Sequence, residues 1–218
     1  FWSWNSELEP QRLQAEIQSM HDAGMGGAFM HSRYGLKTPY LSERWFECVS
    51  ACVEKCRELE IHAYMYDEDR WPSGAAGGLV TKDEKYRMRS LVAREIAKPS
   101  ELDWDSRTLG AFVIRFDGER MASYEALLRG VTAPALSGDQ RLVAFRVELQ
   151  ACSSWYNGYT YLDTMSHEAV QKFIEVTHEA YRKNLGDQLG KRVPGIFTDE
   201  PNHGHVIPGR PEDAAGHP

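Results

Sequence analysis

The sequence predicts an α/β protein that forms a partial (β/α)8 barrel of about four βα units, with an antiparallel β insertion after the third strand. Strand-like and helix-like segments alternate along residues 1–89, which is typical of a parallel sheet with right-handed crossovers. Polar and acidic residues directly follow the strand-like segments, where a barrel carries its active site. A doubly wound sheet usually has a glycine-rich first turn, and the first turn here reads NSELEP.

The first 89 residues contain three strand-like and two helix-like segments. Pro10 suits the first turn of a helix, and Gly24 suits its end. Ser42 is a suitable N-cap for the second helix, because its hydroxyl can accept a hydrogen bond from an N–H of the first turn. The expected elements are a strand at 1–5, a helix from residue 10, a strand at 26–33, a helix after residue 42 and a strand at 61–66.

The pattern changes between residues 90 and 160. Three strand-like runs, SLVAREIA, LGAFVIRF and RLVAFRVEL, are separated by polar stretches that contain glycine or proline, which predicts an antiparallel β insertion. Helical periodicity returns at 166–185, with Ser166 as the N-cap, and the last strand is GIFT. We therefore expect residues 1–89 to begin the barrel, 90–160 to form the insertion and 161–218 to continue the barrel.

Composition excludes several classes of protein. A net charge of −7 argues against a nucleic-acid-binding protein, and no apolar run is long enough for a membrane helix. Cys48, Cys52 and Cys56 recur every four residues and are expected to be core thiols on one helix face rather than metal ligands or disulfides. Because the chain begins at Phe1 without methionine, we expect its natural N-terminus to be missing.

Two acidic clusters follow strand-like segments. GIFTDEP (195–201) places Asp199 and Glu200 after an apolar strand, and IHAYMYDEDRWPSG (61–74) places Asp67, Glu68 and Asp69 after another. Acids at strand ends also serve as solvated groups or helix caps, so each cluster alone is ambiguous. A partly desolvated carboxylic acid at a barrel mouth can act as a general acid, and glycoside hydrolysis needs two carboxyl groups. Since adjacent residues in an extended chain point to opposite sides, we expect one acid of GIFTDEP to face the cleft and the other to support it.

Other polar residues accompany these acids. His31 and Arg33 alternate with Ser32 at the end of the second strand, so they are expected to project to the same side. A single histidine is more often a hydrogen-bonded core residue than a ligand. Residues His203 and His205 could bind a metal together with an acid. No segment matches a phosphate loop, a dinucleotide-binding fingerprint or the nucleophile motif of serine esterases.

Four motifs together resemble glycoside hydrolase family 106 and its α-L-rhamnosidase-like relatives: FWSWN, GGAFMHSRYGLKTPYLS, YMYDEDRWPSGAAGG and GIFTDEP. The similarity spans residues 1–89 and 160–201. It implies a (β/α)8 catalytic domain that cleaves terminal deoxysugars from plant polysaccharides or glycosides with inversion, using one Glu as general acid and another as base. It also implies an association with calcium and a secreted or periplasmic location.

The resemblance also implies residue roles. Glu200 is the expected general acid, and Asp199 is its support. The residues expected to line the sugar pocket are Asn5, His31, Arg33, Tyr66, Asp67, Glu68 and Trp71. The later strands and the base are expected beyond residue 218, in the remainder of the same polypeptide. Two alternatives remain open: a non-catalytic carbohydrate-binding relative, and a metal-dependent hydrolase that uses His31, Asp67, Glu200 and His203.

Overall fold

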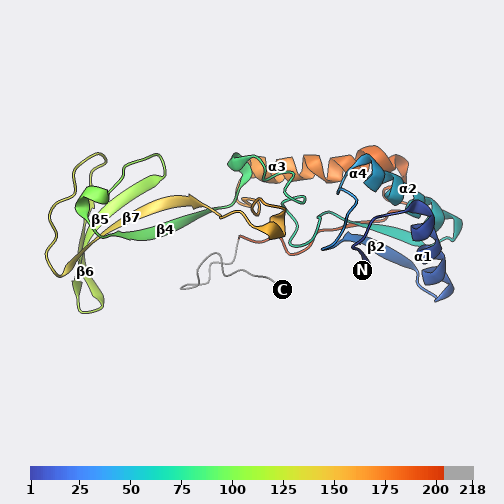
Figure 1. Cartoon of the computed structure of the whole chain (residues 1–218), viewed down its shortest axis with the longest axis horizontal. Helices are drawn as coiled ribbons and strands as arrows, with labels where there is room; N and C mark the ends of the chain where they lie inside the picture. The colour runs from blue at the N-terminus through green and yellow to red at the C-terminus, as the bar shows by residue number, and fades with distance from the viewer. Residues whose placement is uncertain (204–218) are drawn as a thin grey trace. The chain divides into compact units, whose positions relative to one another are not determined.

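The computed structural model describes residues 1–203, which belong to two compact units. The first unit comprises Phe1–Met88 and the chain from Ala151 onward, and the second comprises Arg89–Gln150. The protein is therefore a mixed α/β protein with one parallel and one antiparallel sheet, as the sequence predicts (Figure 1). No helix within residues 1–203 combines the length and the apolar character that a membrane crossing requires.

The first unit is built on a four-stranded parallel sheet whose strand order is β1-β2-β3-β8. Its strands are β1 (Trp2–Trp4), β2 (Gly27–Ser32), β3 (His62–Tyr66) and β8 (Ile196–Phe197). Each strand pairs in parallel with its neighbour in this order. All four strands were predicted, and their order in the sheet follows their order along the chain without a reversal.

Of the helices within residues 1–203, three pack against one face of this sheet, and the third along the chain packs against Ala76, Val80 and Leu162 instead. The helices are α1 (Pro10–Asp22), α2 (Glu43–Glu58), α3 (His167–Val176) and α4 (His178–Leu185), with short 3-10 helices at η1 (Glu84–Tyr86), η3 (Ser154–Tyr156) and η4 (Gly186–Gln188). Alternate strand residues such as Trp4, Met30 and Met65 form a core with buried residues of α1, α2 and α4. The three cysteines of α2 belong to this core, and burial raises the pKa of each thiol.

The helix predicted at 166–185 is two helices. The α3 and α4 helices follow one another in nearly the same direction (Figure 1), with Thr177 between them. The Thr177 hydroxyl donates a hydrogen bond to the Phe173 carbonyl oxygen at 2.7 Å, four residues earlier. Such back-bonding competes with the helical ladder and bends helices. Ser166 caps α3 as predicted, because its Oγ accepts a hydrogen bond from the Ala169 N–H.

The other face of the parallel sheet carries aromatic side chains. We call this the aromatic face and define it by Phe1, Phe29, His31, Tyr64, Tyr66 and Phe197. Register explains the grouping, since Phe29 pairs with Tyr64 and Tyr66 pairs with Phe197, so these rings lie on the same side. Two members remain accessible, Phe1 at 69% and Phe197 at 37% exposure.

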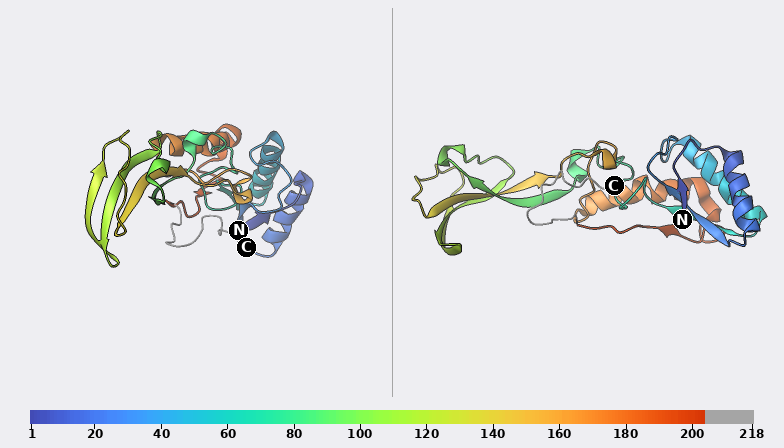
Figure 2. Two further views of the ribbon diagram at one scale, coloured as in Figure 1. Left: turned by 60° about the vertical axis from the view of Figure 1, so that its left-hand side comes forward. Right: turned by 60° about the horizontal axis from the view of Figure 1, so that its bottom comes forward.

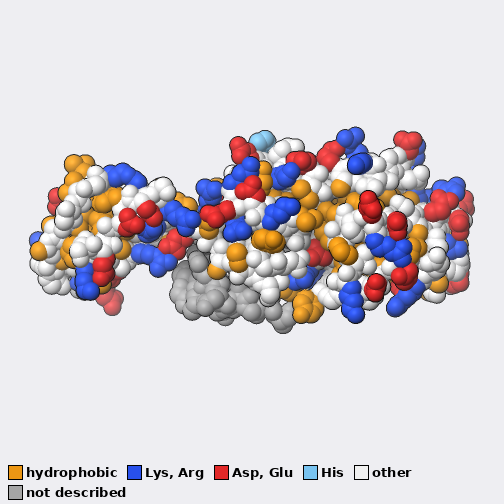
Figure 3. All heavy atoms as spheres, turned by 45° about the horizontal axis from the view of Figure 1, so that its top comes forward, with side chains coloured by type: hydrophobic (Ala, Val, Ile, Leu, Met, Phe, Trp, Pro, Cys, Tyr) orange, Lys and Arg blue, Asp and Glu red, His pale blue; other side chains and the backbone are white. Residues whose placement is uncertain are grey.

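The second unit is a four-stranded antiparallel sheet with strand order β4-β7-β5-β6. Its strands are β4 (Arg89–Ile96), β5 (Thr108–Asp117), β6 (Arg120–Leu127) and β7 (Gln140–Leu149), and a 3-10 helix η2 spans Pro99–Glu101. Figure 2 shows its twist, and Figure 3 shows hydrophobic side chains on its surface. One face packs around Ala111, Leu142 and Ala144.

Two predictions for the insertion need correction. The β6 strand was missed because almost all of its residues are exposed, so it lacks an apolar stripe. The segment 151–160, which we assigned to the insertion, belongs to the first unit. It does so because its backbone carbonyls and Asn157 make hydrogen bonds to the loop that follows β3.

The N-cap of α2 provides a first test of this fold. Ser42 Oγ accepts a hydrogen bond from the Trp45 N–H at 3.2 Å, at the start of a helix that supplies much of the core. Replacing it (Ser42→Ala) is expected to lower the free energy of unfolding by about 1 kcal/mol, measured by urea denaturation. Ser50→Ala, an exposed position on the same helix, is the matched control; equal effects at both positions would contradict the capping role.

Candidate functional site

The loop that follows β3 folds around the buried carboxylate of Glu68. Four backbone N–H groups donate to its two oxygens: Asp69 at 2.8 Å and Gly77 to Oε1, Gly74 at 2.9 Å and Ala76 at 2.7 Å to Oε2. Glu68 is 3% exposed. Burial raises its pKa to about 7, and the four hydrogen bonds limit this rise. Glu68 therefore holds the loop in shape from inside.

Two glycines allow the loop to close so tightly. Gly77 has a φ of +61°, and a Cβ there would lie 2.8 Å from the Cβ of Asp69. A Cβ on Gly78, where φ is +85°, would lie 2.8 Å from the carbonyl oxygen of Tyr156. Gly77 and Gly78 therefore allow the loop to pack closely against Asp69 and against the segment 151–160.

Asp69 and Arg70 are held by the segment 151–160. Asp69 accepts hydrogen bonds from the Ser32 hydroxyl at 2.5 Å and from Asn157 Nδ2 at 2.8 Å, and it is 7% exposed. The Arg70 guanidinium donates to the carbonyl oxygens of Ser154 and Trp155, both at 3.1 Å, and to Asn157 Oδ1 at 2.7 Å. Residues about 85 positions apart in the sequence are thus joined in one polar network.

Asp67 lies on the helix side of the sheet, fully buried. It accepts hydrogen bonds from Ser73 Oγ at 2.5 Å and Thr198 Oγ1 at 2.6 Å, and His178 Nε2 lies 3.3 Å from its Oδ2. Burial raises the pKa of Asp67 against the effect of these hydrogen bonds. This acid connects the ends of β3 and β8 to the start of α4.

Tyr66, His31 and Asp199 meet on the aromatic face. The Tyr66 hydroxyl lies 2.7 Å from Asp199 Oδ2 and 2.8 Å from the Arg70 carbonyl oxygen, and it donates its single proton to one of them at a time. The His31 ring stacks on Tyr66 at a centroid distance of 3.5 Å. His31 Nε2 donates to the Arg70 carbonyl oxygen at 3.0 Å, because that oxygen can only accept. Asp199 is therefore the acid of GIFTDEP that faces this network.

The burial of His31 predicts a pH dependence of stability. Desolvation lowers its pKa from 6.5 to about 4, so the folded state keeps the ring neutral. Its contribution is fully present above pH 6.5 and is lost as the pH falls toward 4. Between pH 7 and pH 5 we expect a loss of about 1–2 kcal/mol in the free energy of unfolding.

This pH effect is checked by urea unfolding of the wild type and of His31→Gln at both pH values. The variant should show a smaller decrease between pH 7 and pH 5. His62→Gln, at an exposed position of β3, is the control and should keep the full decrease. An NMR titration of His31 near its ordinary pKa would contradict the prediction.

Three further residues predicted for the site are Asn5, Glu200 and Trp71. Asn5 and Glu200 are exposed, and Glu200 has a φ of +42°, in the left-handed region. Among residues 1–203, no hydrogen bond or ion pair engages the Glu200 carboxylate. Trp71 is half-buried beside the cis Trp71–Pro72 bond, and its carbonyl oxygen accepts a hydrogen bond from Trp155 Nε1 at 2.5 Å.

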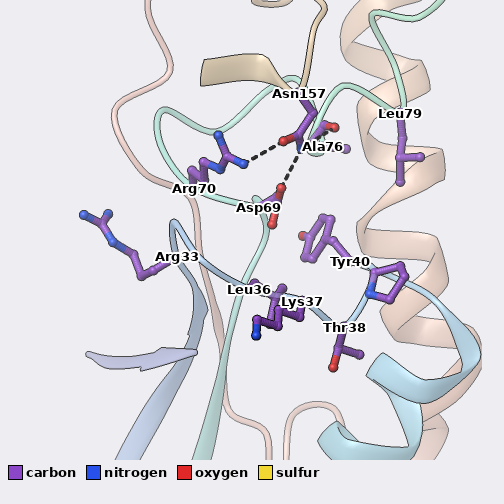
Figure 4. A pocket seen from close by; sticks show the side chains of 12 residues that line it. Arg33, Leu36, Lys37, Thr38, Tyr40, Asp69, Arg70, Ala76, Leu79 and Asn157 are labelled. Atoms are coloured by element: carbon purple, nitrogen blue, oxygen red, sulfur yellow. Dashed lines mark hydrogen bonds between the residues drawn. The ribbon is translucent and has the colours of Figure 1, made fainter. Parts of the chain in front are cut away.

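A pocket of about 260 Å³ opens between the loops that follow β2 and β3 (Figure 4). Its polar and aromatic lining comprises Arg33, Lys37, Tyr40, Asp69, Arg70 and Asn157. Of the residues predicted to line a sugar pocket, only Arg33 lines this one. Lys37 and Tyr40 lie between the strand predicted at 26–33 and the helix predicted after residue 42, and neither was predicted to be a site residue. Their position after a parallel strand was the available signal, since loops at such positions build sites in α/β folds.

The residues proposed for a metal site are not gathered together. His31 belongs to the aromatic face, whereas Asp67 lies on the helix side of the sheet. His203 Nδ1 lies 3.0 Å from the Thr164 hydroxyl. Within residues 1–203 there is no group of three or more His, Cys, Asp or Glu side chains that could hold a metal ion. His205 is outside the described residues.

The strand ends thus combine an acid facing the aromatic face, an exposed acid beside it, and a separate polar pocket. Asp69 is the carboxylate that lines the pocket, whereas Asp199 and Glu200 do not line it. Comparison with known proteins found no matching family model, no similar curated protein and no similar solved structure.

Proposed function

We propose that the chain is part of a glycoside hydrolase that cleaves terminal deoxysugars of the α-L-rhamnoside type from plant polysaccharides or glycosides, with inversion. One observation carries the proposal: the neighbouring parallel strands β3 and β8 both end in acids, and the Tyr66–Asp199 contact joins these ends at 2.7 Å on the aromatic face. Acids from several strand ends meeting at one edge of a parallel sheet are typical of barrel enzymes.

We further propose that the four parallel strands are the first four of a (β/α)8 barrel. The strand order equals the chain order, as it does around a barrel, and α1, α2 and α4 pack on one face. The aromatic face would then be the barrel interior. A parallel sheet is normally covered on both faces, and further strands would cover this one.

Glu200 is the proposed general acid, which protonates the glycosidic oxygen as the bond to the sugar breaks. Asp199 is the proposed positioning residue, because its backbone N–H donates to Ser73 Oγ at 2.9 Å and its carboxylate contacts Tyr66. The base must remove a proton from the attacking water. Asp67, Glu68 and Asp69 already accept hydrogen bonds within the fold, so we propose that the base comes from a later strand of the same polypeptide. No role is assigned to the calcium ion that the resemblance implies.

The full polypeptide tests this proposal. Incubated with an aryl α-L-rhamnoside, it should release rhamnose, and NMR of the first product should show the β-anomer because the reaction inverts. Retention of configuration would contradict the mechanism. Binding of rhamnosides without hydrolysis would favour the non-catalytic relative, an alternative consistent with the number of acids already engaged within the fold.

A further inference from the structure

We propose that the pocket between the loops after β2 and β3 binds a sugar that carries a carboxylate, such as a uronic acid. The sugar part of this inference rests on the proposed function, whereas the negative charge follows from the pocket itself.

The pocket has a positively charged lining. Three basic side chains, Arg33, Lys37 and Arg70, and one carboxylate, Asp69, line it, which gives a net charge of +2. The whole chain carries −7. A positive pocket in an acidic protein concentrates anions and repels other cations. The ligand that suits it is therefore negatively charged.

Two of these cations have no partner in the described part of the chain. Within residues 1–203, the side chains of Arg33 and Lys37 make no ion pair or hydrogen bond. Six cations on the helices of the same unit are paired, whereas Lys183 on α4 is not paired within the same range of residues; the pairs are Arg12 with Glu16, Arg44 with Glu9 and Glu47, Lys55 with Glu58, Arg57 with Glu54, Lys172 with Glu175 and Arg182 with Glu179. Arg33 and Lys37 thus differ from these six paired cations, and from Lys183 in that they line a pocket where their charge is available to a ligand.

The positions of the charged side chains in the pocket give the ligand an orientation. Asp69 is fixed by Ser32 and Asn157, and no ion pair joins it to Arg33 or Lys37 within residues 1–203. In Figure 4, Lys37 lies on the opposite side of Asp69 from Asn157, and the Arg33 side chain extends to the left of Asp69. A carboxylate would therefore bind at the Arg33–Lys37 end, away from Asp69. Hydroxyl groups would bind at the Asp69–Asn157 end, where carboxylate and amide oxygens can accept hydrogen bonds.

The volume of the pocket and the Tyr40 ring in its lining suit a single sugar unit. A volume of about 260 Å³ lies just below the usual range of small-molecule pockets and fits a single sugar unit better than a longer ligand. The Tyr40 ring lines the pocket while its hydroxyl oxygen is buried in the protein. The part of Tyr40 available to a ligand is thus its ring, which suits the C–H groups of a sugar.

The test measures binding to the full polypeptide by isothermal titration calorimetry with three probes: glucuronate, glucose and inorganic sulfate. Glucuronate should bind at least about tenfold more tightly than either of the others, and its affinity should fall between about 0.01 M and about 0.5 M salt. Equal binding of glucose would overturn the charge assignment. Equal binding of sulfate would overturn the assignment to a sugar.

A double variant tests the residues. Arg33→Gln with Lys37→Gln should weaken glucuronate binding at least about tenfold, whereas Lys183→Gln, an exposed cation on α4, should leave it unchanged. Both substituted side chains are exposed, so the fold should persist, and circular dichroism checks this. Unchanged affinity in the double variant would overturn the proposal. Binding needs no turnover, so a failed hydrolysis assay with retained glucuronate binding would reject only the proposed function.

Discussion

Replacing Glu200 by glutamine in the full polypeptide is expected to lower kcat/KM for alkyl α-L-rhamnosides by about 10²–10⁴-fold. Glutamine fills nearly the same space but cannot supply a proton to a poor leaving group. Activated aryl rhamnosides need little protonation, so their kcat/KM should fall much less. The measurement is the ratio of the two losses, obtained from initial rates with an alkyl and an aryl glycoside of the same sugar.

Two variants make this result specific. Asp199→Asn removes a carboxylate that contacts Tyr66. If Asp199 is the positioning residue that we propose, this substitution should lower kcat/KM for both substrates by similar factors. Glu7→Gln, at an exposed position before α1, should change neither. If Glu200→Gln affects both substrates equally while Asp199→Asn spares the aryl glycoside, the general acid is Asp199 and the assignment of Glu200 is wrong.

Much of the parallel unit could be predicted because its signals are local. Pro10 begins α1, Ser42 caps α2, and the alternation of apolar residues in the strands matches the observed faces. The antiparallel unit was predicted less completely. The β6 strand lies at the edge of its sheet and is exposed, so packing left no apolar pattern in its sequence. Gly118, the first residue of the two-residue turn between Asp117 and Arg120, was the signal that could have indicated the hairpin.

The site was harder to predict because its partners are distant in the sequence. The positions of the acids after β3 and β8 were predictable from hydrophobic periodicity. Their hydrogen bonds were not, since Asp69 and Arg70 depend on Asn157, and Asp67 depends on Thr198 and His178. Periodicity places a residue on a strand or loop, but it gives no information on which distant side chain will satisfy a buried carboxylate.

Glu68→Gln is expected to lower the free energy of unfolding of the first unit by about 3–5 kcal/mol. Each oxygen of Glu68 accepts two backbone N–H groups. A glutamine side chain must place its NH2 group against two of these donors, which leaves them unsatisfied in a buried position. Urea denaturation measures the loss, and Glu47→Gln, which removes only a surface ion pair with Arg44, should cost less than about 1 kcal/mol.

The same substitution also tests whether the loop and the pocket are one structure. The backbone that surrounds Glu68 carries Asp69 and Arg70, which line the pocket, and Gly77, whose carbonyl oxygen accepts a hydrogen bond from Asn157. Loss of the internal carboxylate should therefore weaken glucuronate binding as well as stability, although Glu68 lies outside the pocket. A Glu68→Gln variant with wild-type stability and wild-type binding would show that the loop keeps its shape without this acid. A variant that is destabilised but binds normally would show that the pocket depends on Asn157 and the segment 151–160 more than on Glu68.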